Sequence, residues 1–245
     1  MSYPATILAD SPILYLPVWD KVGGSAYDAS THANPGSYLG GQGGPTIGVK
    51  GPGITTGARF QSAQDQVVQV PRIAAYAVGD TMSFEIWFNL ISSGVCGLMS
   101  FGHTAGSNGS AYMRINGGGF EVLSTNTAGI AGPNGTYNDG HWHHAVWTKA
   151  TTTNHMYIDA VDMTPGVTNA TLQDGSENPV IGGDVSNGVL AETFDGMLAH
   201  AAAYNVALTP TQVSAHFAAM TETPSLVARA PGYRHVSPVG FRTRR

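Results

Sequence analysis

The sequence has little charge and a single cysteine. Charged residues make up 11% of its 245 positions, and Cys96 stands alone. One cysteine cannot form an intramolecular disulfide, so the fold must be stabilised by packing or assembly. No apolar run approaches the ~18 residues of a membrane-spanning helix, and the start Met-Ser-Tyr-Pro lacks the basic and apolar regions of a signal peptide. We therefore expect a protein made in a cytoplasm, with no membrane partner.

Signatures of catalysis are also missing. The sequence contains no G-x-S-x-G, H-E-x-x-H, G-x-x-x-x-G-K or C-x-x-C motif. A jelly-roll glycoside hydrolase needs two carboxylates that flank the scissile bond. Glu85 has no acidic partner on its strand, and we expect Glu192 and Asp195, which are close in sequence, to be a solvated pair. The chain is therefore not expected to be an enzyme.

Glycine and apolar residues are abundant. The 32 glycines and the 42% hydrophobic content indicate many tight turns around a sizeable core. A single β-sandwich over residues 1–220 is expected, followed by an extended arm over residues 221–245.

Residues 139–160, DGHWHHAVWTKATTTNHMYIDA, are the clearest hairpin. Strand side chains alternate, so Trp142, His144 and Val146 share one face while Ala145 and Trp147 share the other. Apolar residues on both faces indicate a central strand that is covered on each side. Residues 82–90 alternate in the same way, with Phe84, Ile86 and Phe88 as core candidates.

The hairpin also carries a family resemblance. The run Trp142-His143-His144-Ala145-Val146 and the returning run Met156-Tyr157-Ile158-Asp159 resemble the centre of laminin-G-like, concanavalin-A-like domains. Residues 8–12 (LADSP), 84–88 (FEIWF), 194–198 (FDGML) and 204–209 (YNVALT) agree with that family in the same order. The resemblance spans about residues 5–220 and implies an all-β, two-sheet antiparallel jelly-roll sandwich.

One short C-terminal helix is expected after the last strand. Thr209 is placed as its N-cap, Pro210 at its first position, and Gln212 completes a capping box. Residues 23–57, rich in Gly, Pro, Ser and Asn, are expected to be mostly irregular.

The resemblance raises the question of calcium, because laminin-G-like domains often bind it with loop oxygens. Asp28 and Asn34 match the family's early loop and are the candidate ligands. The family's closing strand carries acids where this chain has Ala199-His200-Ala201, so the resemblance implies a remnant site at most. The alternative is a loop stabilised by the Asp28 side chain. No other cofactor is expected, and the H-x-H pair His141 and His143 is interpreted as packing histidines, not as a zinc site.

Loop aromatic residues could stack on sugar rings. Tyr27, Tyr38, Tyr112 and Tyr137 lie in or beside predicted loops, and the loops 28–38 and 132–138 are candidates for contact with a glycan.

The C-terminal arm differs in charge from the rest of the chain. Residues 224–245 hold five arginines and no acid, whereas the remaining six basic and 16 acidic residues give the body a charge of −10. Prolines and aromatic residues interrupt the arginines, a pattern that favours docking on a protein over binding nucleic acid. Arg234, Phe241, Arg242, Arg244 and Arg245 are the candidate docking residues.

Two functions follow from these observations. Domains that resemble this one occur in virion proteins of tailed bacteriophages, so the first hypothesis is a non-enzymatic virion structural protein, either a capsid decoration or a tail accessory protein. Its arm would bind capsid or tail subunits and its copies would form a homo-oligomer. The alternative is a carbohydrate-binding adhesin module that recognises a host surface glycan.

Overall fold

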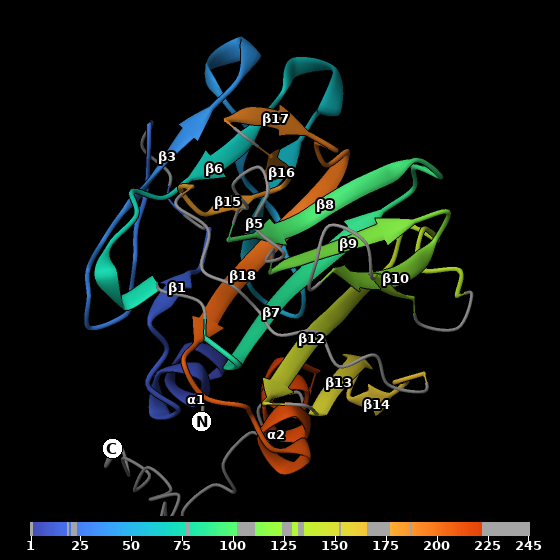
Figure 1. The fold of residues 1–245 in the computed structure, drawn as a ribbon. Coiled ribbons are helices and arrows are strands. Elements are labelled where there is room, and N and C mark those ends of the chain that lie inside the picture. Colours follow the sequence, from blue (N-terminus) through green and yellow to red (C-terminus); the bar gives the residue numbers. More distant parts are fainter. Residues whose placement is uncertain are drawn as a thin grey trace, which may run out of the picture.

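The computed structural model describes residues 2–18, 20, 24–76, 79–101, 111–123, 129–131, 135–151, 153–165, 177–186 and 188–221. Two eight-stranded antiparallel sheets pack against each other as a jelly-roll sandwich (Figure 1). Two α-helices, α1 (Tyr3–Ala9) and α2 (Pro210–Thr221), lie together beside one sheet. The all-β sandwich expected from the sequence is confirmed.

The first sheet has the order β14-β13-β12-β7-β18-β5-β4, and β1 pairs with β18. Its strands are β1 (Leu14–Leu16), β4 (Thr46–Lys50), β5 (Thr56–Phe60), β7 (Thr81–Leu90), β12 (Trp142–Ala150), β13 (Thr153–Ile158), β14 (Val161–Asp162) and β18 (Gly196–Tyr204).

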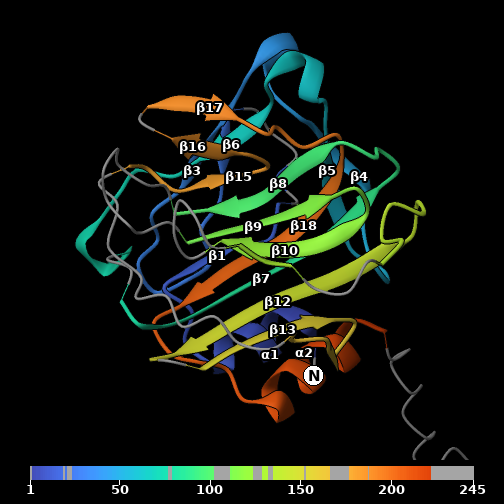
Figure 2. The ribbon, with the colours of Figure 1, turned by 45° about the vertical axis from the view of Figure 1, so that its right-hand side comes forward.

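The second sheet has the order β11-β10-β9-β8-β15-β6-β3-β2. Its strands are β2 (Ser25–Ala26), β3 (Gly36–Leu39), β6 (Val67–Gln69), β8 (Val95–Ser100), β9 (Tyr112–Asn116), β10 (Gly119–Leu123), β11 (Gly129–Ala131) and β15 (Val180–Ile181). A separate hairpin joins β16 (Asp184–Ser186) to β17 (Val189–Ala191), and the 3-10 turns are η1 (Gly41–Gly43), η2 (Ser62–Gln64) and η3 (Ala74–Tyr76). Figure 2 shows the two layers, with β8, β9 and β10 in front of β7 and β18.

The core lies between the sheets and follows the alternation of strand side chains. From β7, Phe84, Ile86 and Phe88 point into it and are at most 1% exposed. From β12, Ala145 and Trp147 join the same core, whereas Val146 belongs to a second cluster outside the first sheet. The central hairpin is confirmed, because β12 lies between β13 and β7 and is covered on both faces.

Helix α2 begins as the sequence predicts. The Thr209 amide donates to Gln212 Oε1 at 2.9 Å, and the Gln212 amide donates to Thr209 Oγ1 at 3.3 Å, which completes the capping box. The expected C-terminal helix is confirmed, and a second helix that was not predicted, α1, precedes the first strand. Its start, Ser2 followed by Pro4, is the same kind of signal, and its buried residues Tyr3 and Ile7 are four apart, on one helix face.

Residues 24–57 are mostly irregular, as expected, but they contain three short strands, β2, β3 and β4. Glycine is what allows these strands. A Cβ on Gly36 would lie 2.6 Å from a methyl group of Val68 on the neighbouring strand β6. Gly48 has φ +81° at the irregularity where β4 pairs with β5. The composition that suggests a loop therefore serves close strand contacts and a bulge.

Neither described helix is long and apolar enough to cross a membrane.

Candidate functional site

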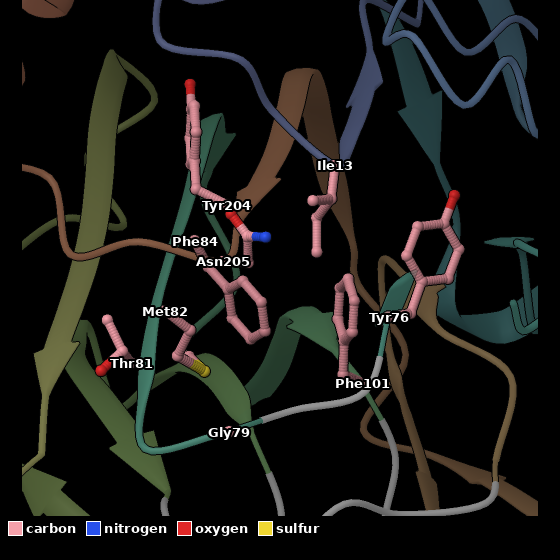
Figure 3. Close-up of a pocket in the computed structure, with 9 residues that line it drawn as sticks. All are labelled: Ile13, Tyr76, Gly79, Thr81, Met82, Phe84, Phe101, Tyr204 and Asn205. Atoms are coloured by element: carbon pink, nitrogen blue, oxygen red, sulfur yellow. The ribbon is translucent and has the colours of Figure 1, made fainter. Parts of the chain in front are cut away.

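A small pocket opens between the sheets where β7 begins. The pocket is lined mainly by apolar and aromatic side chains, among them Ile13, Tyr76, Phe84, Phe101 and Tyr204 (Figure 3). Its volume is about 10 Å³, about the room that one water molecule needs. This pocket cannot hold a sugar ring or a cofactor.

The outer face of the first sheet is covered by the two helices. Tyr3 and Ile7 of α1 and Val213 and Met220 of α2 pack in one apolar cluster with outward-facing residues of the sheet, among them Trp87. The Trp87 ring stacks on that of Phe217 with a centroid distance of 5.7 Å. Among the described residues, Trp87 and the outward-facing residues packed with it are therefore buried under the helices and cannot contact a ligand.

Beneath the helices lies a buried polar network centred on Glu85, which is 0% exposed. Glu85 Oε1 accepts a hydrogen bond from the Tyr204 hydroxyl at 2.6 Å, and Oε2 lies 2.9 Å from His216 Nδ1 and 3.2 Å from His144 Nε2. His216 Nε2 lies 2.8 Å from Asp10 Oδ2. The network therefore joins β7, β12 and β18 to α2 and to the residue that ends α1.

Both ring nitrogens of His216 face carboxylates, which favour the protonated, positively charged form of the ring. Burial alone would lower the pKa of His216, but Glu85 and Asp10 raise it above its ordinary value. Burial likewise opposes ionisation of Glu85, yet the His216 charge and the histidine hydrogen bonds hold the pKa of Glu85 well below its usual range. A nearby histidine behaves differently: burial lowers the pKa of His200 to about 3. The network is thus built on one buried imidazolium between two carboxylates.

The second sheet presents polar side chains on its outer face. Met113 and Ile115 of β9 and Phe120 and Val122 of β10 point into the core, so the residues between them point outward. We call five residues the polar platform. They are Tyr112, Arg114 and Asn116 of β9, Glu121 of β10, and Glu192, which follows β17.

The platform is held together by Arg114. Its Nε donates to Glu121 Oε2 at 2.8 Å, and its Nη1 donates to Glu192 Oε1 at 2.9 Å. Burial would lower the pKa of Arg114, but these two carboxylates raise it. Tyr112 donates to Glu192 Oε2 at 2.6 Å, and Asn116 donates to Glu121 Oε1 at 3.2 Å. The side chains of Arg114, Glu121 and Glu192 are 20%, 18% and 30% exposed, so the cluster is fixed in position and still reaches solvent.

Close backbone contact places Glu192 on the platform. The Gly97 amide donates to the Glu192 carbonyl at 2.6 Å, and a Cβ on Gly97 would lie 2.7 Å from both Gly183 and the Tyr112 hydroxyl. Only glycine at position 97 leaves room for this approach. Glu192 itself has φ +49°, a left-handed conformation that is costly for a residue other than glycine and is concentrated at functional sites.

Glu192 and Asp195 are not the solvated pair that the sequence suggests, because each of them pairs with a different arginine. Asp195 pairs with Arg59 at 2.9 Å on the first sheet, whereas Glu192 belongs to the platform.

The candidate calcium ligands lie close together, and both carboxylate oxygens of Asp28 already accept hydrogen bonds within the chain. Asp28 is 1% exposed and accepts four hydrogen bonds, from the amides of Tyr15, Ser30 and Asn34 and from the Ser30 hydroxyl. Asn34 Nδ2 donates to the Pro71 carbonyl at 2.7 Å. These bonds make Asp28 the centre of its loop. Among the described residues, no group of three or more His, Cys, Asp or Glu side chains could hold a metal ion, and calcium stays a prediction.

The remaining candidates are dispersed. Tyr27 is 55% exposed, Tyr38 is buried, and Tyr112 is a buried platform residue at the start of β9. Tyr137 packs edge-on against His143 at 5.3 Å. The docking residues Arg234, Phe241, Arg242, Arg244 and Arg245, and residues 132–134 of the second candidate loop, lie outside the described residues.

The sequence gives a weak signal for the platform. The alternation of residues 112–116 and 120–123 places Arg114 and Glu121 on one outer face. Their pairing with Glu192, 78 residues after Arg114, could not be read from spacing.

The fold and the platform define a lectin-like β-sandwich with one covered and one accessible outer face. Residues 62–214 match a laminin G family model described as the concanavalin A-like lectin/glucanases superfamily. The chain belongs to this family. A search of curated proteins finds no match.

Several solved structures share the fold. Domain 4 of AbnA, a GH43 extracellular arabinanase from Geobacillus stearothermophilus solved in complex with arabinotriose, is 17% identical with a TM-score of 0.60, over 84% of this chain and 98% of that chain. The binding domain of Paraclostridial Mosquitocidal Protein 1 is 13% identical with a TM-score of 0.65, over 86% of this chain. The binding domain of botulinum neurotoxin serotype D is 14% identical with a TM-score of 0.61, over 88% of this chain. The alignments span 52% of each of the two toxin domains.

Proposed function

We propose that this protein is a non-catalytic carbohydrate-binding module and that the polar platform is its sugar-binding site. The observation that carries the proposal is the platform itself: a guanidinium, two carboxylates and an amide, held on β9, on β10 and just after β17, and partly open to solvent. Sugar hydroxyls both donate and accept hydrogen bonds, so they match such a mixed set of groups. The arabinotriose complex of a domain with the same fold supports the proposal.

The same geometry favours binding over hydrolysis. A glycosidase needs one carboxyl group to protonate the leaving oxygen and a second to act as nucleophile or base. Glu121 and Glu192 are instead both paired with Arg114, which is not the arrangement of an acid and a separate nucleophile or base. Glu85 lies under the helices, where a polysaccharide cannot reach it.

Removing a charged group of the platform should weaken binding. For Arg114→Ala and for Glu192→Gln we expect affinity for a bound oligosaccharide to fall about 10- to 100-fold, because a hydrogen bond to a charged group contributes about 1.5–3 kcal/mol. Isothermal titration with a panel of oligosaccharides that includes arabinotriose measures this effect.

Arg59→Ala is the matched control for this experiment. Arg59 also pairs with a carboxylate and is 39% exposed, but it lies on the first sheet. Its replacement should leave affinity unchanged. Equal affinity of wild type and both platform variants would place the sugar elsewhere.

The virion hypothesis rests on a separate part of the chain. Its support is the charge of residues 224–245 relative to the body, together with the family resemblance, and we propose that these residues dock on another protein. Under this hypothesis the protein would be part of a virion, bound to capsid or tail subunits as a homo-oligomer.

Deletion of residues 224–245 tests the two roles together. We expect the shortened chain to bind the same oligosaccharide with unchanged affinity, because the platform lies in residues 112–192. A pull-down with both chains from lysate of the source system should recover a capsid or tail subunit with the full chain alone. Equal recovery by both chains would contradict docking through the arm.

A further inference from the structure

The charge of the platform restricts the sugars that it can take. Arg114 is the one cation among the platform residues, and it is opposed by Glu121 and Glu192. A third carboxylate, Asp184 of β16, lies beside them and accepts a hydrogen bond from Ser100 of β8 at 2.7 Å. Burial raises the pKa of the Tyr112 hydroxyl, and the charges of Glu192 and Asp184 raise it further. Within the platform, two carboxylates therefore oppose one guanidinium.

The hydrogen bonds that Arg114 already makes leave few of its N–H groups available to an anionic ligand. An acidic ligand is usually held by two parallel N–H groups of one guanidinium. Here the Nε and Nη1 edges already donate to the two glutamates. Nη2 is the one guanidinium nitrogen of Arg114 that has no hydrogen-bond partner among the described residues. It can donate to a hydroxyl oxygen, while the carboxylate oxygens of Glu121 and Glu192 can accept hydrogen bonds from hydroxyl groups.

From this arrangement we infer that the platform selects neutral saccharides and rejects those with a carboxylate or sulfate group. The inference rests on the proposed function, since it assigns the ligand class of the same site. Adjacent hydroxyl groups of a neutral sugar would donate to the glutamates and accept from Arg114. A sugar acid would instead bring its negative charge against two fixed carboxylates, with no available fork to compensate.

A chemically matched pair of ligands provides the test. The full chain is titrated with an oligogalacturonide and with its methyl ester, which has the same backbone without charge. It is also titrated with neutral oligosaccharides and with the sulfated, negatively charged forms of the same oligosaccharides. Within any pair that binds, we expect the neutral member to bind at least about tenfold more tightly, with affinity that changes little between about 0.01 M and 1 M salt.

The variant Glu121→Gln separates charge from shape. Glutamine keeps the size of the side chain and removes one negative charge, so the ratio of neutral to acidic affinity should fall while the fold is retained. Tighter binding of the acidic member, weakened by salt and lost in Arg114→Gln, would overturn the inference and leave the proposed function standing. Absence of binding to every oligosaccharide would overturn the proposed function and this inference together.

Discussion

Replacement of Glu85 by Gln is expected to lower the free energy of unfolding by about 3–5 kcal/mol, which is the usual effect of breaking a buried ion pair from one side. The neutral amide of the new side chain would leave the His216 imidazolium with Asp10 as its remaining counter-charge. Burial magnifies this loss, because Glu85 and His216 are both 0% exposed. Urea unfolding at neutral pH measures the change.

Glu121→Gln is the control for that measurement. It removes the same charge from a partly exposed ion pair on the second sheet, where an effect of at most about 1 kcal/mol is expected. If Glu85→Gln were no more destabilising than Glu121→Gln, the network would not be a main support of the helices.

The stability of the protein is also expected to fall as the pH rises from neutral toward alkaline. The folded-state pKa of His216 is raised above its ordinary value of 6.5. Its contribution is therefore complete below pH 6.5 and is lost as the pH rises through the folded-state pKa. At the acid side, the pKa of Glu85 is lowered from 4.5, so its contribution is present above pH 4.5 and is lost at much lower pH.

Urea unfolding at a series of pH values between about 6 and 9 tests this second expectation, below the range in which tyrosines titrate. His216→Gln should be destabilised at pH 6 and should show a smaller alkaline decline than the wild type; part of the decline should remain, because Asp159 and Asp139 raise the pKa of His143 as well. His155→Gln is the control, because His155 also contacts an acid, Asp162, but is 41% exposed. A decline of equal size in His216→Gln would assign it to other groups.

The parts of the fold that the sequence predicts are those set by local pattern. Alternation defines β7 and the hairpin of β12 and β13, and Thr209 with Gln212 defines the start of α2. Helix α1 is short and β2 to β4 are rich in glycine, so their local signals are weak compared with the tertiary contacts that form them.

The two polar clusters could not be predicted for another reason. Glu85 meets His216 across 131 residues, and Arg114 meets Glu192 across 78. The order of the strands in the sheets brings such residues together, and this order cannot be read from the spacing of the residues in the sequence. Glu85 on a strand and Glu192 near a turn each look ordinary until the sheet order is known.

The pairing of α1 with α2 also fixes how the module can be oriented. Both helices lie on the outer side of the first sheet, and the start of α1 lies near α2 (Figure 2). The platform is on the opposite side of the sandwich. A tether attached before α1 or after α2 would leave from the back of the molecule, so the platform would point away from whatever surface carries it.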